Sequence, residues 1–486
     1  MGKPMGRGLY KMKPIEVMDP VEAEKIHINS LHLLEAMGIR IVSSEALQLL
    51  KAAGADVDEK TKVARIPSHL VMESVRKCKR PVRLCARNPK NDLVLDGKHC
   101  YICTDGTGLA TIDLETGVRR PSTKRDVAES AKIVDYLEFM NIYYPLVTPL
   151  DVPKHAHTVH EFEAAFNNCE KHIVSGATYL REEAQYELKM AAAVVGGEKE
   201  LKRRPIVSAV TCTSSPMVLG MTTDVAIEFV RAGCPPMMMT MPLIGATAPM
   251  TVAGAVLLGN AQVLALTTVC QLAAPGSPVC YSTEPMAMDV QTGIFEGLFP
   301  AANMVRASHV QMARYYKIPI FVGGWGSCSK VPDAQAAYEK VLSAFLYYLS
   351  GADITSGPGL LENWTVLSYE QLLIDYEIYT MMVDMLKGFP VTEDSMAIEV
   401  VKKVGHEGHF LGQKHTLEHF KEMWQPIVTD GQPYQTWKAS GSKSAVDHAR
   451  AKAKEILETH EVTPLPEDLK KELAKIVKEG EEKIPH

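Results

Sequence analysis

Three histidines and a glutamate lie close together in the stretch "HFLGQKHTLEH", residues 409–419. The last five residues, His415 to His419, have the H-x-x-E-H spacing of one class of zinc peptidases. Two histidines at this spacing bind one metal ion only if both lie on the same helix, one turn apart. Thr416 is a good N-cap for a helix that continues through Phe420, and a helix starting there would leave His415 outside it. The sequence therefore favours hydrogen-bonding histidines over a zinc peptidase centre.

Cys100 and Cys103 form a C-x-x-C pair, the spacing of many metal and redox sites. They lie in an apolar stretch that is typical of a strand, where residues three apart point to opposite faces. The ten cysteines are scattered along the chain, which is typical of reduced thiols rather than of a disulfide framework. A shared metal or redox role for this pair is not favoured.

The elements that must position any site follow a repeat of strand and helix. From about residue 100, short apolar runs alternate with amphipathic stretches, and the runs are too apolar to have one solvated face. Strands covered on both faces and separated by helices indicate a parallel sheet. The eight predicted strands are 101–105, 140–147, 172–177, 205–211, 236–241, 279–283, 319–324 and 352–357.

Eight such units predict an α/β protein with a closed (β/α)8 TIM barrel. An open doubly wound sheet is the alternative, but no G-x-G-x-x-G follows the first strand to support it. The predicted organisation is a helical N-terminal extension (1–98), the barrel (99–390) and a helical C-terminal cap segment (391–486).

Composition limits the classes of partner. The chain has 486 residues, of which 46% are apolar and 23% charged, the profile of a soluble globular protein. A formal net charge of −6 gives no electrostatic basis for binding nucleic acid or an anionic membrane. The basic N-terminus lacks the apolar core of a signal peptide, so we expect a cytoplasmic protein. The apolar run 250–274 is interrupted by Asn260 and Gln262 and suits a buried helix better than a membrane span.

Active sites of such barrels lie at the carboxyl ends of the strands. The residues there are rich in hydroxyl and aromatic side chains and include no obvious lysine or cysteine nucleophile. Trp325 would place an indole at the mouth, where its face could hold a cation, or it could simply fill the mouth as packing. Glu284 could neutralise a cationic substrate or accept backbone hydrogen bonds from the loops. The strand-end residues are Asp105, Tyr143, Tyr144, Thr211, Thr213, Thr240, Glu284, Gly323, Gly324, Trp325 and Ser356.

Two longer stretches carry a resemblance. "GHFLGQKHTLEHFKEMWQPIVTDGQPYQTWKASG" (408–441) and "GGWGSCSKVPDAQAAYEK" (323–340) resemble the trimethylamine methyltransferase superfamily, and the similarity runs over nearly the whole chain. The resemblance implies a barrel enzyme that takes a methyl group from a methylamine or betaine and passes it to a corrinoid protein. It also implies that cobalamin is carried by that partner protein, with no cofactor bound directly.

Some archaeal members of that superfamily carry pyrrolysine in the loop after the seventh strand. Here the loop, from Gly324 to Ser327, contains only standard residues. The resemblance therefore points to the branch without pyrrolysine, which is similar to betaine methyltransferases. A quaternary ammonium also leaves as a neutral tertiary amine without prior protonation, so such an enzyme needs mainly positioning and a site for a cation.

From strand-end position and the resemblance, Glu284 and Trp325 are the predicted catalytic residues, and no metal ligand is predicted. The expected partners are a small methylated amine, a cognate corrinoid protein and further copies of this chain in a homo-oligomer. The alternatives are a trimethylamine-type enzyme, a zinc-dependent enzyme and a barrel that binds without catalysis. The zinc ligands would be His406, His409, His415 and His419. The predicted substrate-binding residues are Tyr143, Tyr144, Thr211, Thr240, Trp325, Ser356, His409 and Phe410.

Overall fold

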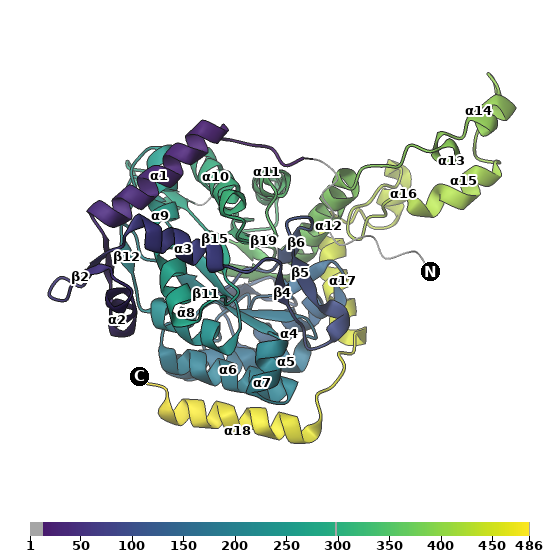
Figure 1. Ribbon diagram of the computed structural model, residues 1–486. Coiled ribbons are helices and arrows are strands. Elements are labelled where there is room, and N and C mark those ends of the chain that lie inside the picture. Colours follow the sequence, from purple (N-terminus) through teal and green to yellow (C-terminus); the bar gives the residue numbers. More distant parts are fainter. Residues whose placement is uncertain (1–12, 297–298, 486) are drawn as a thin grey trace.

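The computed structural model describes residues 13–296 and 299–485. Eight parallel strands close into a barrel, in the order β10-β11-β13-β15-β18-β19-β6-β9 (Figure 1). All eight predicted strands are confirmed, and the open-sheet alternative is wrong. The barrel strands are β6 (Tyr101–Cys103), β9 (Met140–Tyr143), β10 (His172–Ser175), β11 (Val207–Cys212), β13 (Pro236–Thr240), β15 (Cys280–Thr283), β18 (Ile320–Gly323) and β19 (Ile354–Ser356).

A helix follows each barrel strand and covers the outside of the barrel, as parallel βα units require. A short helix, α7 (Glu198–Arg203), lies between α6 and β11. The covering helices are α4 (Lys124–Tyr136), α5 (His157–Asn168), α6 (Arg181–Val195), α8 (Thr222–Ala232), α9 (Val252–Ala273), α10 (Pro300–Tyr316), α11 (Ala334–Ser350) and α12 (Tyr369–Leu386).

Local sequence explains the sharp boundaries of these helices. The Asp333 side chain accepts a hydrogen bond from the Ala336 amide and caps the start of α11. Gly351 ends the same helix in the left-handed region, at φ +89°, where a side chain would be strained. A capping box between Thr123 and Asp126 starts α4.

Among the described residues, α9 is long and apolar enough to cross a membrane, and 78% of its most apolar window is buried inside the protein. Its polar residues are bonded within the fold. The Asn260 amide donates to Ser30 Oγ at 2.8 Å and to Tyr316 Oη at 2.9 Å. The sequence-based expectation of a buried helix over this run is confirmed.

The segment before the barrel is not purely helical as expected, because it also contains short strands. Alternation of buried and exposed residues over stretches as short as "IRI" gives too little periodicity to recognise them. Three helices, α1 (Pro20–Ala36), α2 (Ser44–Ala52) and α3 (Ser68–Lys77), pack against α9. The small sheet contains β12 (Val218–Leu219), β1 (Ile39–Ile41), β3 (Val63–Arg65) and β2 (Asp56–Asp58).

An antiparallel hairpin of β4 (Val82–Leu84) and β5 (Leu93–Leu95) closes the amino-terminal end of the barrel. Its apolar side chains are buried against interior residues of the barrel strands, such as Cys280 and Ile354. Tyr101 Oη, on the first barrel strand, donates to the Val94 carbonyl of the hairpin at 3.2 Å. This end of the barrel is therefore sealed by the chain itself.

Small two- and three-residue strands flank the opposite, carboxyl-terminal end. One sheet contains β14 (Leu243–Ile244), β16 (Met286–Met288) and β17 (Phe295–Glu296). The other contains β20 (Leu360–Leu361), β21 (Val366–Ser368), β7 (Ala110–Ile112) and β8 (Arg119–Pro121). They belong to the loops that follow the barrel strands and shape the mouth.

After α12 the chain leaves the barrel and forms an arm, coloured light green in Figure 1. The arm helices are α13 (Glu393–Met396), α14 (Ile398–Val404), α15 (Lys414–His419) and α16 (Tyr434–Ala439). The chain then returns to the barrel, where α17 (Ala445–Thr459) packs against α4 and α12. Finally, α18 (Glu467–Lys483) packs against α5 and α6.

Candidate active site

Alternation along the strands decides which strand-end side chains face the inside of the barrel. Interior residues such as Cys103, Ile142 and Cys280 share one apolar cluster with the closing hairpin. Counting in steps of two from these positions brings Asp105, Tyr144 and Glu284 to the inner face at the mouth. Ser356 lies two residues beyond Ile354 of the same cluster and reaches the same layer.

Asp105 is held at the mouth by two hydrogen bonds to its carboxylate. The Gly106 amide donates at 2.9 Å and Ser356 Oγ donates at 3.1 Å. The residue is only 4% exposed, and this burial raises the pKa of Asp105 to about 6 in spite of the two hydrogen bonds. Ser356 thus positions one acid of the site.

Glu284 lies across the mouth against the backbone of β18. A Cβ added at Gly323 would come within 2.8 Å of the carboxyl carbon of Glu284, so only glycine leaves room for this side chain. Burial raises the pKa of Glu284 well above its usual range, and the negative charge of Asp105 raises it further. Arg306 opposes this shift with its positive charge. The mouth therefore holds two interacting carboxyl groups that do not ionise independently.

Tyr144 lies over a cradle of two glycines. A Cβ at Gly176 would come within 1.6 Å of Tyr144 Oη, and one at Gly106 within 2.0 Å of the ring. Burial raises the pKa of the Tyr144 phenol well above its usual value, and Asp105 and Glu284 add to the shift, so the ring stays neutral. A neutral aromatic face beside two acids is suited to a cation.

Arg306 brings a positive charge to the site from α10. Its guanidinium packs against Gly324, where an added Cβ would come within 2.6 Å of Nε, and φ of +138° also requires glycine. The guanidinium carbon lies 5.9 Å from the centre of the Tyr347 ring and 6.0 Å from that of Trp364. The site thus contains charges of both signs.

A buried ion pair fixes the two loops that follow β18 and β19. Lys340 Nζ lies 2.8 Å from Asp375 Oδ2, and both side chains are 0% exposed. Lys340 also donates to the carbonyls of Trp325, at 2.8 Å, and Gly357, at 3.2 Å. Asp375 accepts from the Gly359 amide at 2.8 Å. This pair connects α11 and α12 to the backbone beside Ser356.

Four predicted substrate-binding residues point away from the inside of the barrel. Tyr143 Oη donates to the Val127 carbonyl of α4 at 2.9 Å, and Thr240 Oγ1 donates to Gln262 Oε1 of α9 at 2.6 Å. Thr211 is also on the outer side of its strand, with Oγ1 3.5 Å from the Met237 carbonyl oxygen. Trp325 is fully buried, with its ring centre 6.1 Å from that of Tyr379 of α12. The packing alternative for Trp325 is the one that fits this position.

His409 and Phe410 lie in the arm, between α14 and α15, and Phe410 is 48% exposed. The Phe410 carbonyl accepts a hydrogen bond from Thr416 Oγ1 within the arm, at 2.6 Å. The structure does not bring these two residues together with Glu284. A cap segment that follows the barrel in sequence need not lie over its mouth.

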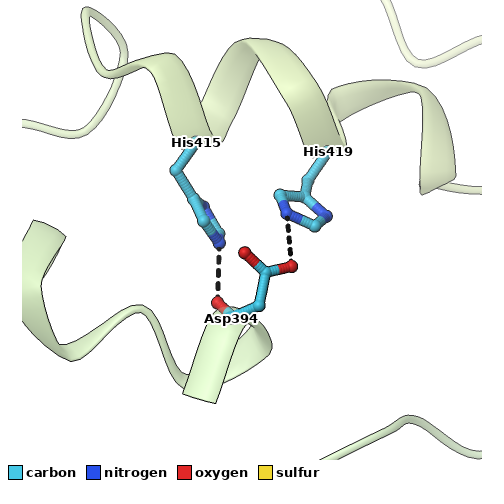
Figure 2. A group of neighbouring side chains, drawn as sticks. All are labelled: Asp394, His415 and His419. Carbon is cyan, nitrogen blue, oxygen red and sulfur yellow. Dashed lines mark hydrogen bonds and ion pairs between the residues drawn. The ribbon is translucent and has the colours of Figure 1, made fainter. Parts of the chain in front are cut away.

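Thr416 does not cap a helix, which corrects the argument made from sequence. The helix α15 begins at Lys414, with Gln413 as N-cap, and therefore contains both His415 and His419. Their neighbour is Asp394 (Figure 2). Glu418 pairs instead with Lys414, at 2.9 Å. His406 and His409 are not part of this group.

The strand-end criterion does not select Arg306, Lys340 or Asp375. All three lie on covering helices. An ionisable residue within an otherwise apolar helical stretch, as in "KVLSAFLYYL" and "LLIDYEIY", was the available signal. Cys100, directly before β6, and Cys103, at its end, lie in different apolar clusters on opposite sides of the barrel wall, as predicted.

Comparison with known proteins assigns the family. The family model for trimethylamine methyltransferase (MTTB) matches residues 6–485. The chain belongs to this family. A relative named trimethylamine methyltransferase MttB, from Desulfitobacterium hafniense (strain DSM 10664 / DCB-2), is 37% identical over 95% of this chain and 93% of its own.

Two further relatives differ in their named substrates. Trimethylamine methyltransferase MttB of Methanosarcina barkeri (strain Fusaro / DSM 804) is 32% identical, over 94% of this chain and 93% of its own. A glycine betaine methyltransferase from Desulfitobacterium hafniense (strain Y51) is 29% identical, over 90% of this chain and 91% of its own. The relatives thus agree on methyl transfer but not on the methyl donor.

A solved structure, the hydroxylamine complex of MtmB, superposes with a TM-score of 0.53 and 12% identity, covering 93% of this chain and 95% of that one. At this identity the match shows the fold alone, a TIM barrel. Membership of the trimethylamine methyltransferase family and the barrel fold together direct attention to the mouth that holds Glu284, Asp105 and Tyr144.

Proposed function

We propose that this protein transfers a methyl group from a quaternary amine of the betaine type to the cobalt of a separate corrinoid protein. The observation that carries the proposal is the buried mouth of the barrel, where Tyr144 lies beside Glu284 and Asp105 and the positive charge of Arg306 acts on both acids. The family and the glycine betaine methyltransferase among its relatives support the same chemistry.

The partner's corrinoid supplies the nucleophile, a Co(I) electron pair that forms a bond to the methyl carbon while the C–N pair stays on nitrogen. A quaternary donor therefore leaves as a neutral tertiary amine, and no proton has to be delivered. The residues of this chain then have three tasks: to bind the ammonium, to orient one methyl group toward the opening and to exclude water.

Glu284 and Asp105 would balance the positive charge of the ammonium, and Tyr144 would contact its methyl groups through the ring face. Their buried position strengthens each of these interactions, because little water competes for the cation. Ser356 would keep Asp105 in place through its hydrogen bond. Tyr144 and Asp105, rather than Trp325 and Tyr143, would therefore contact the ammonium.

A betaine suits the site better than trimethylamine for two reasons. A betaine carries a carboxylate as well as an ammonium, and the site contains Arg306 as well as two acids. The loop from Gly324 to Ser327 contains only standard residues. A trimethylamine-type enzyme is the alternative, favoured by the names of two relatives.

The test is to incubate the purified protein with reduced corrinoid protein and a panel of methylated amines while following the Co(I) absorbance. We expect Co(I) to be consumed with one or more betaines and not with trimethylamine. Turnover of trimethylamine with no betaine active would overturn the choice of donor. Tight betaine binding without any loss of Co(I) would overturn the catalytic role.

Glu284→Gln, which keeps the shape of the side chain but removes its charge, should lose activity in the same assay. Glu59→Gln is a matched control, because Glu59 is an exposed surface residue of the N-terminal segment with its side chain 72% exposed.

The homo-oligomer and the cytoplasmic location remain predictions, as does the absence of nucleic-acid and membrane partners.

A further inference from the structure

The arm has very little core of its own. Its four helices, α13 to α16, are 4, 7, 6 and 6 residues long, and none of them contains a buried residue. Isolated helices of this length are unstable in water. Small units with so little apolar burial are commonly held together by a disulfide, a metal ion or a partner.

Asp394, His415 and His419 gather at the contact between α13 and α15 (Figure 2). The two imidazole rings come from successive turns of α15, and their centres lie 4.2 Å apart. His419 Nε2 is 3.5 Å from Asp394 Oδ2, and one potential ligand atom from each of the three residues lies within 4.8 Å of the others. Ligand atoms of a tetrahedral zinc ion are separated by roughly 3.4 Å, so small side-chain rotations would complete the geometry.

A fourth residue prepares His419 for metal binding. His419 Nδ1 lies 3.0 Å from Glu422 Oε1. When Nδ1 donates its proton to this carboxylate, Nε2 keeps a free lone pair, and that atom faces Asp394. A carboxylate behind a histidine is the arrangement that fixes the tautomer of metal-binding histidines.

We propose that Asp394, His415 and His419 bind one divalent transition-metal ion, and that zinc fits this set of ligands best. Two imidazole nitrogens and one carboxylate oxygen are typical zinc ligands, with water in the remaining position. The ion would join α13 to α15 and close the chain between residues 394 and 415. Its role is to order the arm, and it is independent of the methyl-transfer chemistry proposed above.

His415 must move for the ion to bind. In the structure its Nε2 lies 3.1 Å from the Asp394 carbonyl oxygen. Rotation of the ring breaks this contact and turns Nε2 toward the Asp394 carboxylate. Glu418 takes no part, because it pairs with Lys414 on another side of the helix.

The competing explanation is a network of ion pairs without a metal, in which His419 is protonated and lies between Asp394 and Glu422. Both explanations use the same residues, so the experiment must separate them.

Protein purified without a histidine tag and stripped with a chelator is titrated with zinc against a chromophoric competitor. We expect one equivalent to bind, and His419→Ala and Asp394→Asn to weaken binding by at least about 100-fold.

Two further variants sharpen the test. Glu422→Gln should weaken zinc binding by about 10- to 100-fold, because it removes the group that orients His419. His406→Ala is the matched control, an exposed arm histidine outside the cluster, and should bind zinc like the unchanged protein.

Cobalt(II) in place of zinc should show the visible absorption of a four-coordinate site, and zinc should slow proteolysis of the arm. No zinc binding, or equal binding by His419→Ala, would overturn the proposal in favour of the ion-pair network.

Discussion

Glu284 and Asp105 share a buried mouth in which neither carboxyl group ionises freely. Burial raises the pKa of both groups, and the negative charge of Asp105 raises that of Glu284 further. A bound ammonium favours the charged forms, so its binding must release a proton at neutral pH. The site is thus easier to fill with a cation as the pH rises.

This linkage gives the first prediction. Betaine affinity should increase with pH from 6 upward, and calorimetry in buffers of different ionisation enthalpy should detect proton release on binding. In Glu284→Gln the release should diminish and the affinity fall by about tenfold or more, the equivalent of 1.4 kcal/mol. Affinity that is independent of pH, with no proton release, would contradict the assignment.

The same pKa shifts also affect the stability of the fold. Cation affinity should rise with pH, whereas the contribution of these groups to stability should fall. A carboxyl group whose pKa is raised by folding stabilises the protein while protonated, and this contribution is lost as the pH rises through the folded-state value. Glu284→Gln should therefore raise the melting temperature at pH 8 while it lowers activity, and the gain should shrink toward pH 5. If Glu284→Gln lowered both the melting temperature and the activity, Glu284 would instead have a purely structural role.

Tyr143 and Tyr144 are adjacent in the chain but face opposite sides of the barrel wall. Tyr144→Leu should weaken ammonium binding several-fold, since an aromatic face beside a desolvated cation contributes roughly 1–2 kcal/mol. Tyr144→Phe keeps the face and should retain most of the affinity. Tyr143→Phe is the matched control, because its hydroxyl bonds to Ser130 and Val127 of α4, outside the barrel. It should cost about 1 kcal/mol of stability and leave the Michaelis constant unchanged.

At the scale of elements, Lys340 of α11 and Asp375 of α12 fix the loops at the mouth of the barrel from the outer, helical layer. Each side chain is fully buried and each bonds to the backbone of the loops after β18 and β19. Removal of one partner leaves an uncompensated buried charge, whereas removal of both leaves only lost packing and backbone hydrogen bonds. The pair therefore connects the helix layer to the backbone that carries the candidate site.

Denaturant titration can check this coupling. Lys340→Met or Asp375→Leu alone should lower the free energy of unfolding by about 3–5 kcal/mol, and the double variant should lose less than the sum of the two. The single variants should also disturb the loop that follows Ser356 and reduce kcat. Additive losses in the double variant would show that the two groups do not interact.

Sequence patterns locate the helices and strands well, but they say much less about which side chains of a strand face the inside of the barrel. The eight strands could be located because an apolar run between two amphipathic helices has few other structures available to it. The inner face could not be selected, because every strand is buried on both sides and the apolar pattern is the same for each. Tyr143, Thr211 and Thr240 therefore satisfied the strand-end criterion equally well, although they point to the helices.

At the scale of the whole molecule, the C-terminal helix α18 fastens the end of the chain to the far side of the barrel. Leu473, Ile476 and Val477 are buried, and Gly480 lies against Val159 of α5. Lys189 and Glu479 add an ion pair at 2.5 Å. The charged sequence of this helix suggests a purely solvated role, but one stripe of it is part of the core.

Truncation after residue 465 tests this role. It exposes the apolar surface of α5 and α6 and should lower the free energy of unfolding by several kcal/mol, since each buried aliphatic side chain contributes about 1.5–3 kcal/mol. Glu479→Gln removes only the exposed ion pair and should change stability by less than about 1 kcal/mol. An unchanged melting temperature after truncation would show that α18 is dispensable.

The hairpin that seals the amino-terminal end of the barrel also has a kinetic consequence. With one end closed by Val82, Leu84, Leu93 and Leu95, the small donor and the large acceptor protein of the proposed reaction would both have to use the other end. A docked acceptor would cover the opening, so the donor has to enter first and the demethylated amine has to leave after the acceptor departs. We therefore expect compulsory-order kinetics, with the amine as leading substrate, and excess acceptor protein should inhibit turnover most strongly when the amine is scarce.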